Sequence, residues 1–375
     1  MLGKQSTYIS IIFLSSLLWA CGGNDAPEPS GPIDGPTTNN SYIISDTFEG
    51  ENYMVVASGE QGFIGAFKAE LSDGTPVQLS ELPQAWPTVL LDETGTAYDF
   101  LGKAISGERE GEKLVSMNTQ LGYYFSLNAY YPSVIYPNQV IERPIVDKST
   151  SAWSIDPSFV FRATFPDAIQ ALNSPAFVSV DFKDAIDENF FLDPEERVLV
   201  IRNGNEIKVY PHRVLDWHEI VNDQILNDKI VVSYCPLTGT GSVWNAQLGA
   251  TNASFGVSGL LYNNNLILFD RATSSLWSQI GKEAINGTLK DQPAQEYAYE
   301  DLKWKAVIPL VTDYNVKVMS LETGLGYDYD IYPYGNYKND QDRLNLPVSY
   351  RDKKIPGKEI VLGVIVNKKA KIYRF

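Results

Sequence analysis

The chain carries TGTAYDFLGK at residues 94–103, and this segment aligns without a gap on TSSLWSQIGK at residues 273–282. Each copy continues into Ala-Ile-x-Gly, which ends at Gly107 in the first copy and at Gly287 in the second. Such self-similarity is typical of a repeated structural unit. The alternative is coincidence, because turn-rich patterns of Gly and Thr recur by chance. The alignment predicts two pseudo-repeated modules.

A second match connects the two ends of the folded part. Residues 361–373 resemble residues 198–210, which open the central module, whereas the N-terminal module has no such opening pair of strands. We therefore predict that the C-terminal strands complete the N-terminal module. This arrangement would bring the ends of the folded part together.

Short apolar runs separated by Gly, Asn, Asp and Pro dominate the sequence from about residue 41 onward. Residues 53–56, 198–201, 230–234 and 361–366 are typical of strands, and the 22 Tyr residues suit half-buried sheet surfaces. The best helix candidate is residues 211–222, where apolar side chains recur at three- and four-residue spacing. The predicted fold class is mainly β with a few short helices.

Composition excludes several classes of protein. The 375 residues include 46 acidic and 30 basic side chains, which gives a net charge of −16, with only two His and two Cys. So few nitrogen and sulfur ligands exclude a His-rich metal centre, a zinc ribbon and a disulfide-stapled scaffold. Because no run of Lys or Arg is present, the acidic balance argues against nucleic acid as a partner.

The N-terminus has the pattern of an exported protein. Lys4 precedes a mostly apolar stretch at residues 9–20, which is too short to cross a bilayer as a helix and is typical of a signal peptide. Leu18-Trp19-Ala20-Cys21 is similar to a bacterial lipobox, although Trp19 is bulkier than that pattern usually carries. We predict lipidation at Cys21 and attachment to a membrane of the bacterial cell envelope. The alternative is an ordinary secretory signal with a chance Cys.

The domain boundaries follow from these patterns. We predict a signal peptide at residues 1–20, and the lipidated Cys with a flexible tether rich in Pro and Gly at residues 21–40. An N-terminal β module would occupy residues 41–150. The central module would occupy residues 151–375, with its last strands pairing back to the N-terminal module.

The rarest reactive side chains fall in one short window. His212, His218 and Cys235 lie there together with Glu219 and Asp223. In a helix, His212 and His218 would point about 120° apart, so they are poor co-ligands. His212 would sit at the helix start and meet water, whereas His218 would share the apolar face and could be a core residue. Glu219 and Asp223 could form an acid/base couple or a solvated charged face.

Cys235 lies where a predicted strand ends and a Gly-rich turn begins. A thiol at such a place could bind copper(I) or another soft metal together with His218. It could also act as a nucleophile with His218 as its base. The third possibility is a small buried apolar side chain, which is how most free Cys residues behave.

A second polar group consists of Asp270 and Arg271 with Trp277 and Gln279. Asp270 beside Arg271 at a strand edge could be a catalytic acid, but this pattern more often forms an ion pair or anchors a turn. Trp277 and Gln279 are candidate binding residues.

A series of ordered motifs runs through the second half of the chain. The motifs are WHEIVND at residues 217–223, YCPLTG at 234–239, FGVSGLLYN at 255–263, FDR at 269–271, LWSQ at 276–279, ETG at 322–324, YPYGNY at 332–337 and GKE at 357–359. Together they resemble the bacterial and archaeal domain-of-unknown-function family 3179 over about residues 160 to 375. No biochemical role comes with the resemblance, which assigns no function to His218, Glu219, Cys235, Asp270, Arg271, Trp277 or Gln279. Some members carry a second Cys where Thr238 stands here, and this departure weakens a dithiol interpretation.

Three functions remain open from the sequence. The leading hypothesis is an exported, lipid-anchored protein with a soft-metal site, copper first, at Cys235 and His218. The second is a thiol-dependent enzyme with Cys235 as nucleophile. The third is a surface binding module for a glycan or a protein, which would use exposed Tyr and Trp as stacking platforms.

Overall fold

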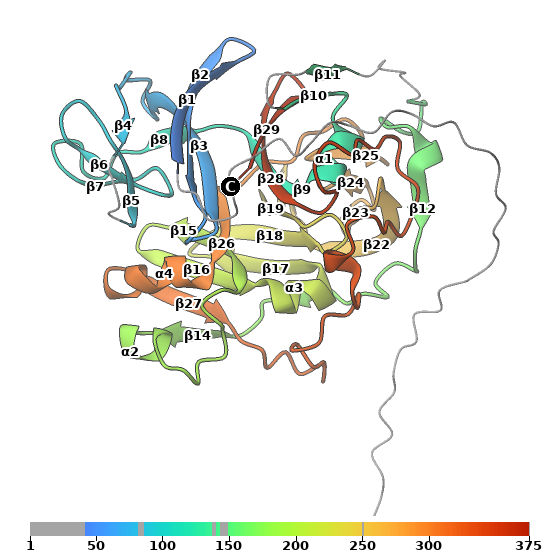
Figure 1. Ribbon diagram of the computed structural model, residues 1–375. Coiled ribbons are helices and arrows are strands. Elements are labelled where there is room, and N and C mark those ends of the chain that lie inside the picture. The colour runs from blue at the N-terminus through green and yellow to red at the C-terminus, as the bar shows by residue number, and fades with distance from the viewer. Residues whose placement is uncertain (1–41, 82–85, 137–139, 143–148, 250, 375) are drawn as a thin grey trace, which may run out of the picture. The chain divides into compact units, whose positions relative to one another are not determined.

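The computed structural model describes residues 42–81, 86–136, 140–142, 149–249 and 251–374 (Figure 1). The predicted signal peptide, Cys21 and the tether lie outside the described residues. Strands dominate the described part, and each of its four α-helices has only four to seven residues. The prediction of a mainly β fold with a few short helices is confirmed.

Six sheets of four or five strands are arranged as a β-propeller, and we number these blades by their order around it. Blade 1 has the order β14 (Phe177–Val180), β27 (Asn315–Met319), β16 (Glu206–Pro211), β15 (Arg197–Asn203) and β26 (Tyr299–Lys303). Blade 2 has the order β13 (Leu172–Asn173), β17 (Ile220–Ile225), β18 (Asp228–Cys235) and β19 (Thr240–Asn245). Blade 3 has the order β12 (Val160–Arg162), β22 (Phe255–Tyr262), β23 (Asn265–Asp270), β24 (Leu276–Ser278) and β25 (Glu283–Asn286).

The other three blades are built mainly by the N-terminal part of the chain. Blade 4 has the order β11 (Val140–Glu142), β10 (Ser133–Ile135), β29 (Lys369–Tyr373), β28 (Ile360–Val366) and β9 (Thr119–Tyr123). Blade 5 has the order β1 (Tyr42–Phe48), β2 (Glu51–Ser58), β3 (Phe63–Leu71) and β8 (Leu114–Ser116). Blade 6 has the order β4 (Ser80–Glu81), β5 (Thr88–Leu91), β6 (Ala97–Asp99) and β7 (Ala104–Ser106).

Short elements connect the strands within and between the blades. The α-helices are α1 (Tyr124–Tyr130), α2 (Phe182–Ala185), α3 (His212–His218) and α4 (Trp304–Val307). Single 3₁₀ turns occur at Pro157–Phe159, Ile308–Thr312 and Tyr337–Asn339, and β20 (Gln247–Leu248) pairs with β21 (Thr251–Asn252). None of the helices in the described ranges has the length and apolar character needed to span a bilayer.

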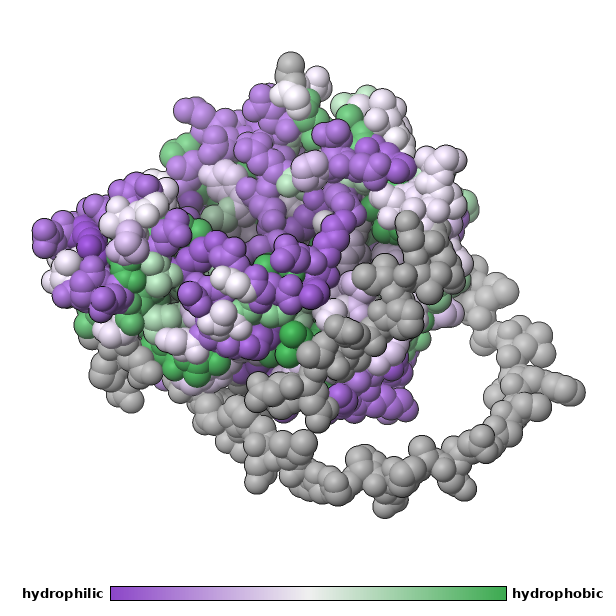
Figure 2. Space-filling view, turned by 90° about the horizontal axis from the view of Figure 1, so that it is seen from above, coloured by the Kyte–Doolittle hydropathy of each residue, from purple (hydrophilic) through white to green (hydrophobic). Residues whose placement is uncertain are grey.

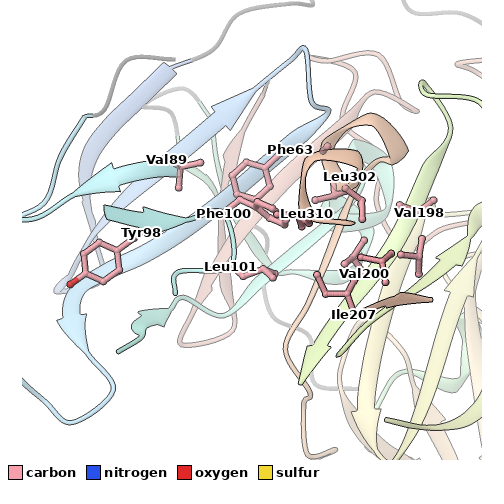
Figure 3. Close-up of a cluster of buried hydrophobic side chains, with 14 of the residues drawn as sticks. Phe63, Val89, Tyr98, Phe100, Leu101, Val198, Val200, Ile207, Leu302 and Leu310 are labelled. Atoms are coloured by element: carbon pink, nitrogen blue, oxygen red, sulfur yellow. The ribbon is translucent and has the colours of Figure 1, made fainter. Parts of the chain in front are cut away.

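Apolar cores between neighbouring blades close the ring. One cluster joins blades 1 and 2, a second joins blades 2 and 3, a third joins blades 3 and 4, and a fourth joins blades 4 and 5. The largest cluster joins blades 5, 6 and 1, and Phe63, Phe100 and Val200 are among its buried members (Figure 3). The face shown in Figure 2 is mostly hydrophilic and carries hydrophobic residues only in small groups. The apolar side chains therefore hold blade against blade.

The last strands of the chain lie beside its first module, as the sequence predicted. β28 pairs antiparallel with β9, and β29 pairs parallel with β10 (Figure 1). Blade 1 has the same connectivity, because β15 pairs antiparallel with β26 and β16 pairs parallel with β27. Blades 4 and 1 thus have the same arrangement of these four strands.

The two aligned segments share an aspartate-centred turn. Asp92 accepts hydrogen bonds from the backbone and hydroxyl of Thr94 and from the Tyr98 hydroxyl. Asp270 accepts the corresponding bonds from the backbone and hydroxyl of Thr273 and from the indole nitrogen of Trp277. The two segments are therefore similar because, in each, a buried carboxylate accepts the hydrogen bonds of the same kind of turn.

The predicted helix at residues 211–222 is shorter than expected. α3 ends at His218, and Glu219 has a φ of 57°, in the left-handed region that stops a helix. Residues 220–225 then form β17, which pairs with β18 along its whole length. The β-branched Ile220 and Val221 favour a strand, so local strand preference and sheet pairing replaced the last turn of the expected helix.

Candidate functional site

Cys235 is the last residue of β18, at the strand end where the sequence placed it. Its side chain is fully buried, and Sγ lies 3.6 Å from the carbonyl oxygen of Asn264. Burial raises the pKa of the thiol to about 11, and the nearby Glu219 carboxyl adds to this shift. At neutral pH the side chain is a protonated thiol, whereas nucleophilic attack and soft-metal binding both use the thiolate.

His218 ends α3 and is fully buried. Its Nδ1 lies 2.7 Å from the Gln170 carbonyl oxygen, and its Nε2 lies 2.7 Å from the Tyr329 hydroxyl. Burial lowers the pKa of the imidazole, which favours the neutral ring. Both nitrogens are engaged with partners other than Cys235. Within the described residues, no group of three His, Cys, Asp or Glu side chains is placed to hold a metal ion.

Two carboxyls near Cys235 have pKa values close to neutrality. Burial raises the pKa of Glu219 to about 7, although the Tyr334 hydroxyl donates a 2.8 Å hydrogen bond to the carboxylate and opposes the shift. Burial also raises the pKa of Asp216 to about 7, and this residue lies one helical turn earlier on α3. The Asp216 carboxyl also contributes to the raised pKa of Glu219, and the sequence did not single out Asp216.

Asp223, for which the sequence left open an acid/base couple with Glu219 or a solvated charged face, has other partners in the structure. It lies on β17, where it accepts a 2.7 Å bond from the Lys208 ammonium group and a 2.8 Å bond from the Tyr210 hydroxyl. The predicted helix at residues 211–222 included Glu219 and ended just before Asp223. Because β17 begins at Ile220, the two carboxylates belong to different elements and Asp223 is a buried ion-pair partner.

Several of the motif strings meet around the turn that follows Cys235. The Tyr337 hydroxyl donates a 2.9 Å bond to the Leu237 carbonyl oxygen, and the Lys358 ammonium donates a 2.7 Å bond to the Asp340 carbonyl oxygen. The Tyr337–Leu237 bond and the Tyr334–Glu219 bond join segments that lie 100 and 115 residues apart in sequence. We call the group of Asp216, Glu219, Cys235, Tyr334 and Tyr337 the motif cluster.

Gln279 and Trp277 are buried parts of the fold. The side-chain oxygen of Gln279 accepts bonds from Thr240 and Asn265, and its nitrogen donates to Ser233 and to the backbone of Thr240. Trp277 is 1% exposed, and its indole nitrogen is bonded to Asp270. Neither side chain presents a free polar atom or an open ring to a ligand.

Asp270 and Arg271 point to different partners. Asp270 is fully buried and anchors its turn, as described above. Arg271 forms a bidentate ion pair with Asp167, at 2.6 and 2.8 Å, and both side chains are exposed. The sequence weighed an ion pair or turn anchor against a catalytic acid. The contacts agree with the structural roles.

His212 is less exposed than the sequence suggested. Its side chain is 12% exposed, and its Nε2 lies 3.2 Å from a carboxylate oxygen of Asp301. The imidazole also lies against the Tyr234 ring, with 4.2 Å between ring centroids. The expectation that His212 meets water was wrong, because blade 1 places β26 across the start of α3.

A cavity of about 360 Å³ lies where the inner strands of the propeller meet. Blades 1, 4, 5 and 6 all contribute to its wall, together with the segment before β26. The polar lining residues include Lys113, Arg202, Glu296, Glu300 and Asp301. We call this space the central cavity.

Two charged groups in the central cavity lack protein partners. Within the described residues, neither the Lys113 ammonium group nor the Glu300 carboxyl group forms a hydrogen bond or an ion pair, and both side chains are half-buried. Burial lowers the pKa of Lys113 and raises that of Glu300 well above its usual range. Each group also influences the pKa of the other, so they lie near one another without contact.

A second hollow, of about 460 Å³, lies on blade 1 and the turn after β17. Its two lysines are already paired: Lys208 bonds to Asp223, and Lys317 bonds to Glu206 at 2.7 Å. This hollow therefore lacks the unpaired charges of the central cavity.

The sequence interpretation missed Lys113 and Glu300. Neither residue belongs to a recognisable motif, and they lie 187 positions apart, on segments that meet only when the propeller closes. One signal was available in Tyr299-Glu300-Asp301-Leu302, where two adjacent carboxylates interrupt a run that otherwise favours a strand. Charged residues inside a short strand are unusual unless they are paired or functional.

Comparison with known proteins gives one match. A family described as protein of unknown function (DUF3179) matches residues 166–375. No curated protein and no solved structure matches the chain. The matched region contains Glu300 and the motif cluster, whereas Lys113 lies before it.

Proposed function

The chain belongs to the family of proteins of unknown function DUF3179, and from this premise we propose that it binds a small polar molecule in its central cavity, as a lipid-anchored protein of the bacterial cell envelope. The observation that carries this proposal is the pair of unpartnered groups, Lys113 and Glu300, that face the cavity. Removing a charged group from water without giving it a partner is unfavourable. Titratable groups held in this state are characteristic of functional sites.

The size and lining of the cavity support a small ligand. Its volume of about 360 Å³ falls within the range of about 300 to 1,000 Å³ that is usual for small-molecule sites. The wall combines apolar side chains such as Ile64 and Leu121 with a few charged groups. This composition is typical of sites in which apolar contact supplies affinity and polar groups fix orientation.

The envelope location rests on the N-terminal pattern. Residues 9–20 have the length and polarity of a signal peptide, and Cys21 follows in a lipobox-like context. A multiply acylated Cys21 would hold the propeller at a membrane surface, because each buried CH₂ contributes about 0.8 kcal/mol. The tether at residues 21–40 would then separate the binding domain from the bilayer.

A thiol or copper function at Cys235 is the second candidate. It is favoured by the convergence of the motif strings around the turn after Cys235. Against it stand the burial of the thiol, its raised pKa, and the engagement of both His218 nitrogens. A glycan-binding surface has less support, because no Trp among the described residues is exposed.

A cavity-filling substitution tests the proposal. We would measure thermal shifts of the purified protein in detergent with a panel of anionic, cationic, zwitterionic and neutral small molecules. Ser116→Trp fills the central cavity, and Ser179→Trp, in the second hollow, is the matched control. We expect at least one chemical class to stabilise the wild type and Ser179→Trp but not Ser116→Trp. Equal responses in all three proteins, or no response at all, would contradict the proposal.

A further inference from the structure

Most of the charged side chains that line the central cavity form an ion pair with another residue. Arg202 is bonded to Asp99 at 2.6 Å, and Arg197 holds Asp301 through a 3.0 Å bond to its carboxylate. Glu296, which also lines the cavity, accepts a bond from the Lys282 ammonium group at 2.5 Å. Among the described residues that line the cavity, this leaves one cation and one anion unmatched.

Those two groups, Lys113 and Glu300, have opposite charge and lie close enough to affect each other's pKa without forming an ion pair. A ligand with only a carboxylate would satisfy Lys113 and leave Glu300 facing it. A ligand with only an ammonium group would satisfy Glu300 and leave Lys113 unpaired. A molecule that carries both charges satisfies both groups at once.

The wall also contains apolar side chains, beside polar ones such as Asn118 and Thr119. Blades 4 and 5 contribute a group of buried aliphatic side chains, and Leu101 follows β6 of blade 6. Burial of an apolar group against such a surface contributes about 25 cal/mol per Å². The aliphatic side chains are Ile64, Leu101, Met117, Leu121 and Leu362.

We propose that the central cavity binds a small zwitterion with an aliphatic side group, such as an aliphatic α-amino acid, with its carboxylate at Lys113 and its ammonium group at Glu300. This inference rests on the proposed function and specifies its ligand class. The half-buried setting strengthens both contacts, because the effective dielectric constant there is lower than in water. The ammonium group would also stabilise the ionised form of Glu300, which burial disfavours.

Isothermal titration with three related probes tests the charge requirement. L-leucine carries both charges, 4-methylpentanoate lacks the ammonium group, and isopentylamine lacks the carboxylate. We expect L-leucine to bind the full-length protein in detergent at least ten-fold more tightly than either analogue, since a hydrogen bond to a charged group contributes about 1.5 to 3 kcal/mol. Equal or tighter binding of an analogue would overturn the inference.

Two variants assign the charges to their residues. Lys113→Met should weaken L-leucine binding at least ten-fold and leave isopentylamine binding unchanged. Glu300→Gln should weaken L-leucine binding to a similar degree and leave 4-methylpentanoate binding unchanged. Lys317→Met, which removes a paired lysine from the second hollow, is the control and should bind like the wild type. Thermal unfolding of each variant confirms that it is folded.

The outcomes separate this inference from the proposed function. If only one-charge or neutral probes bind, and Ser116→Trp blocks them, the central cavity is a binding site but the zwitterion inference is wrong. If L-leucine binds but neither Lys113→Met nor Glu300→Gln changes its affinity, the assignment of charges is also wrong. If no probe binds, the inference fails together with the proposed function.

Discussion

The motif cluster and the central cavity use polar residues in opposite ways. Around Cys235 most polar side chains are buried and matched: Glu219 has Tyr334 and His218 has two partners, whereas Asp216 forms no hydrogen bond within the described residues. In the central cavity, Lys113 and Glu300 are only half-buried and unmatched. Polar groups whose hydrogen bonds are all satisfied within the protein stabilise a unique fold, whereas unsatisfied groups that face a cavity can bind a ligand. The rarest side chains of the chain thus lie in its most closed region.

The largest effect should come from breaking the saturated network beside the motif cluster. Asn265 donates to Thr238, Thr240 and the side-chain oxygen of Gln279, and all four residues are buried. Asn265→Ala would remove these three bonds and the one that the Ile280 backbone N–H donates to the Asn265 side-chain oxygen. At about 1 kcal/mol for each buried bond, we expect a loss of at least about 3 kcal/mol. Denaturant unfolding measures it, with exposed Asn252→Ala as the control. A loss below 1 kcal/mol would show that the network does not hold the fold.

A second prediction concerns the pH dependence of stability through Glu219. Its pKa is raised from 4.5 to about 7 in the folded protein, so the folded state binds the proton more tightly than the unfolded state. Stability from this group is therefore fully present below pH 4.5 and is lost as the pH rises to about 7. The shift corresponds to about 3 kcal/mol.

Glu219→Gln removes this dependence because the amide does not titrate. We expect the variant to gain stability relative to the wild type between pH 5 and pH 8, by up to about 3 kcal/mol, while Asp216 keeps its own dependence in both proteins. Urea unfolding across this pH range measures the difference. Parallel stability curves for the two proteins would contradict a buried, neutral Glu219.

A third prediction concerns the release of a proton by Glu300 when a ligand binds in the central cavity. Burial holds the pKa of Glu300 well above its usual range, with Asp99 and Asp301 raising it further and Lys113 lowering it. A ligand ammonium group requires the ionised carboxylate, so its binding should release a proton. Affinity should then rise with pH, by up to about ten-fold per pH unit, until Glu300 ionises in the free protein.

Titration calorimetry in phosphate and Tris buffers measures the released proton from the difference in apparent enthalpy. Glu300→Gln should release none, and Lys113→Met should still release one wherever it binds. Identical enthalpies in the two buffers for the wild type would show that Glu300 does not ionise on binding.

Much of the fold was predictable because it depends on local sequence. The aligned segments at residues 94–103 and 273–282 share a turn built on Asp92 and Asp270, and such a turn leaves a pattern of Thr, Ser and Gly. The pairing of β28 with β9 was likewise inferred from the missing opening strands of the first module. Helix length was not predictable, since pairing of β17 with β18 decided where α3 ends.

The candidate site was harder to predict because its residues are common and distant in sequence. Counting rare residues led to Cys235 and His218, yet rarity says nothing about exposure or hydrogen bonding. Lys113 and Glu300 come together only through ring closure, which pairs the C-terminal hairpin with β9 and places β26 at the centre. Which charges remain unpaired depends on every neighbouring side chain, and this information is absent from any single segment.

The smallest effect is expected at Cys235 itself. Its thiol is fully buried, and its pKa of about 11 leaves almost no thiolate at neutral pH. After loading with Cu(I) and dialysis, the wild type and Cys235→Ala should retain the same amount of metal. Copper bound elsewhere is common to both proteins, so only copper bound by this thiol would make them differ. Iodoacetamide should label Cys235 slowly in the folded protein and fully in urea, with an apparent pKa above the value of about 8.5 for a free thiol. One additional copper per molecule in the wild type, or rapid labelling near pH 7, would favour the motif cluster over the central cavity as the functional site.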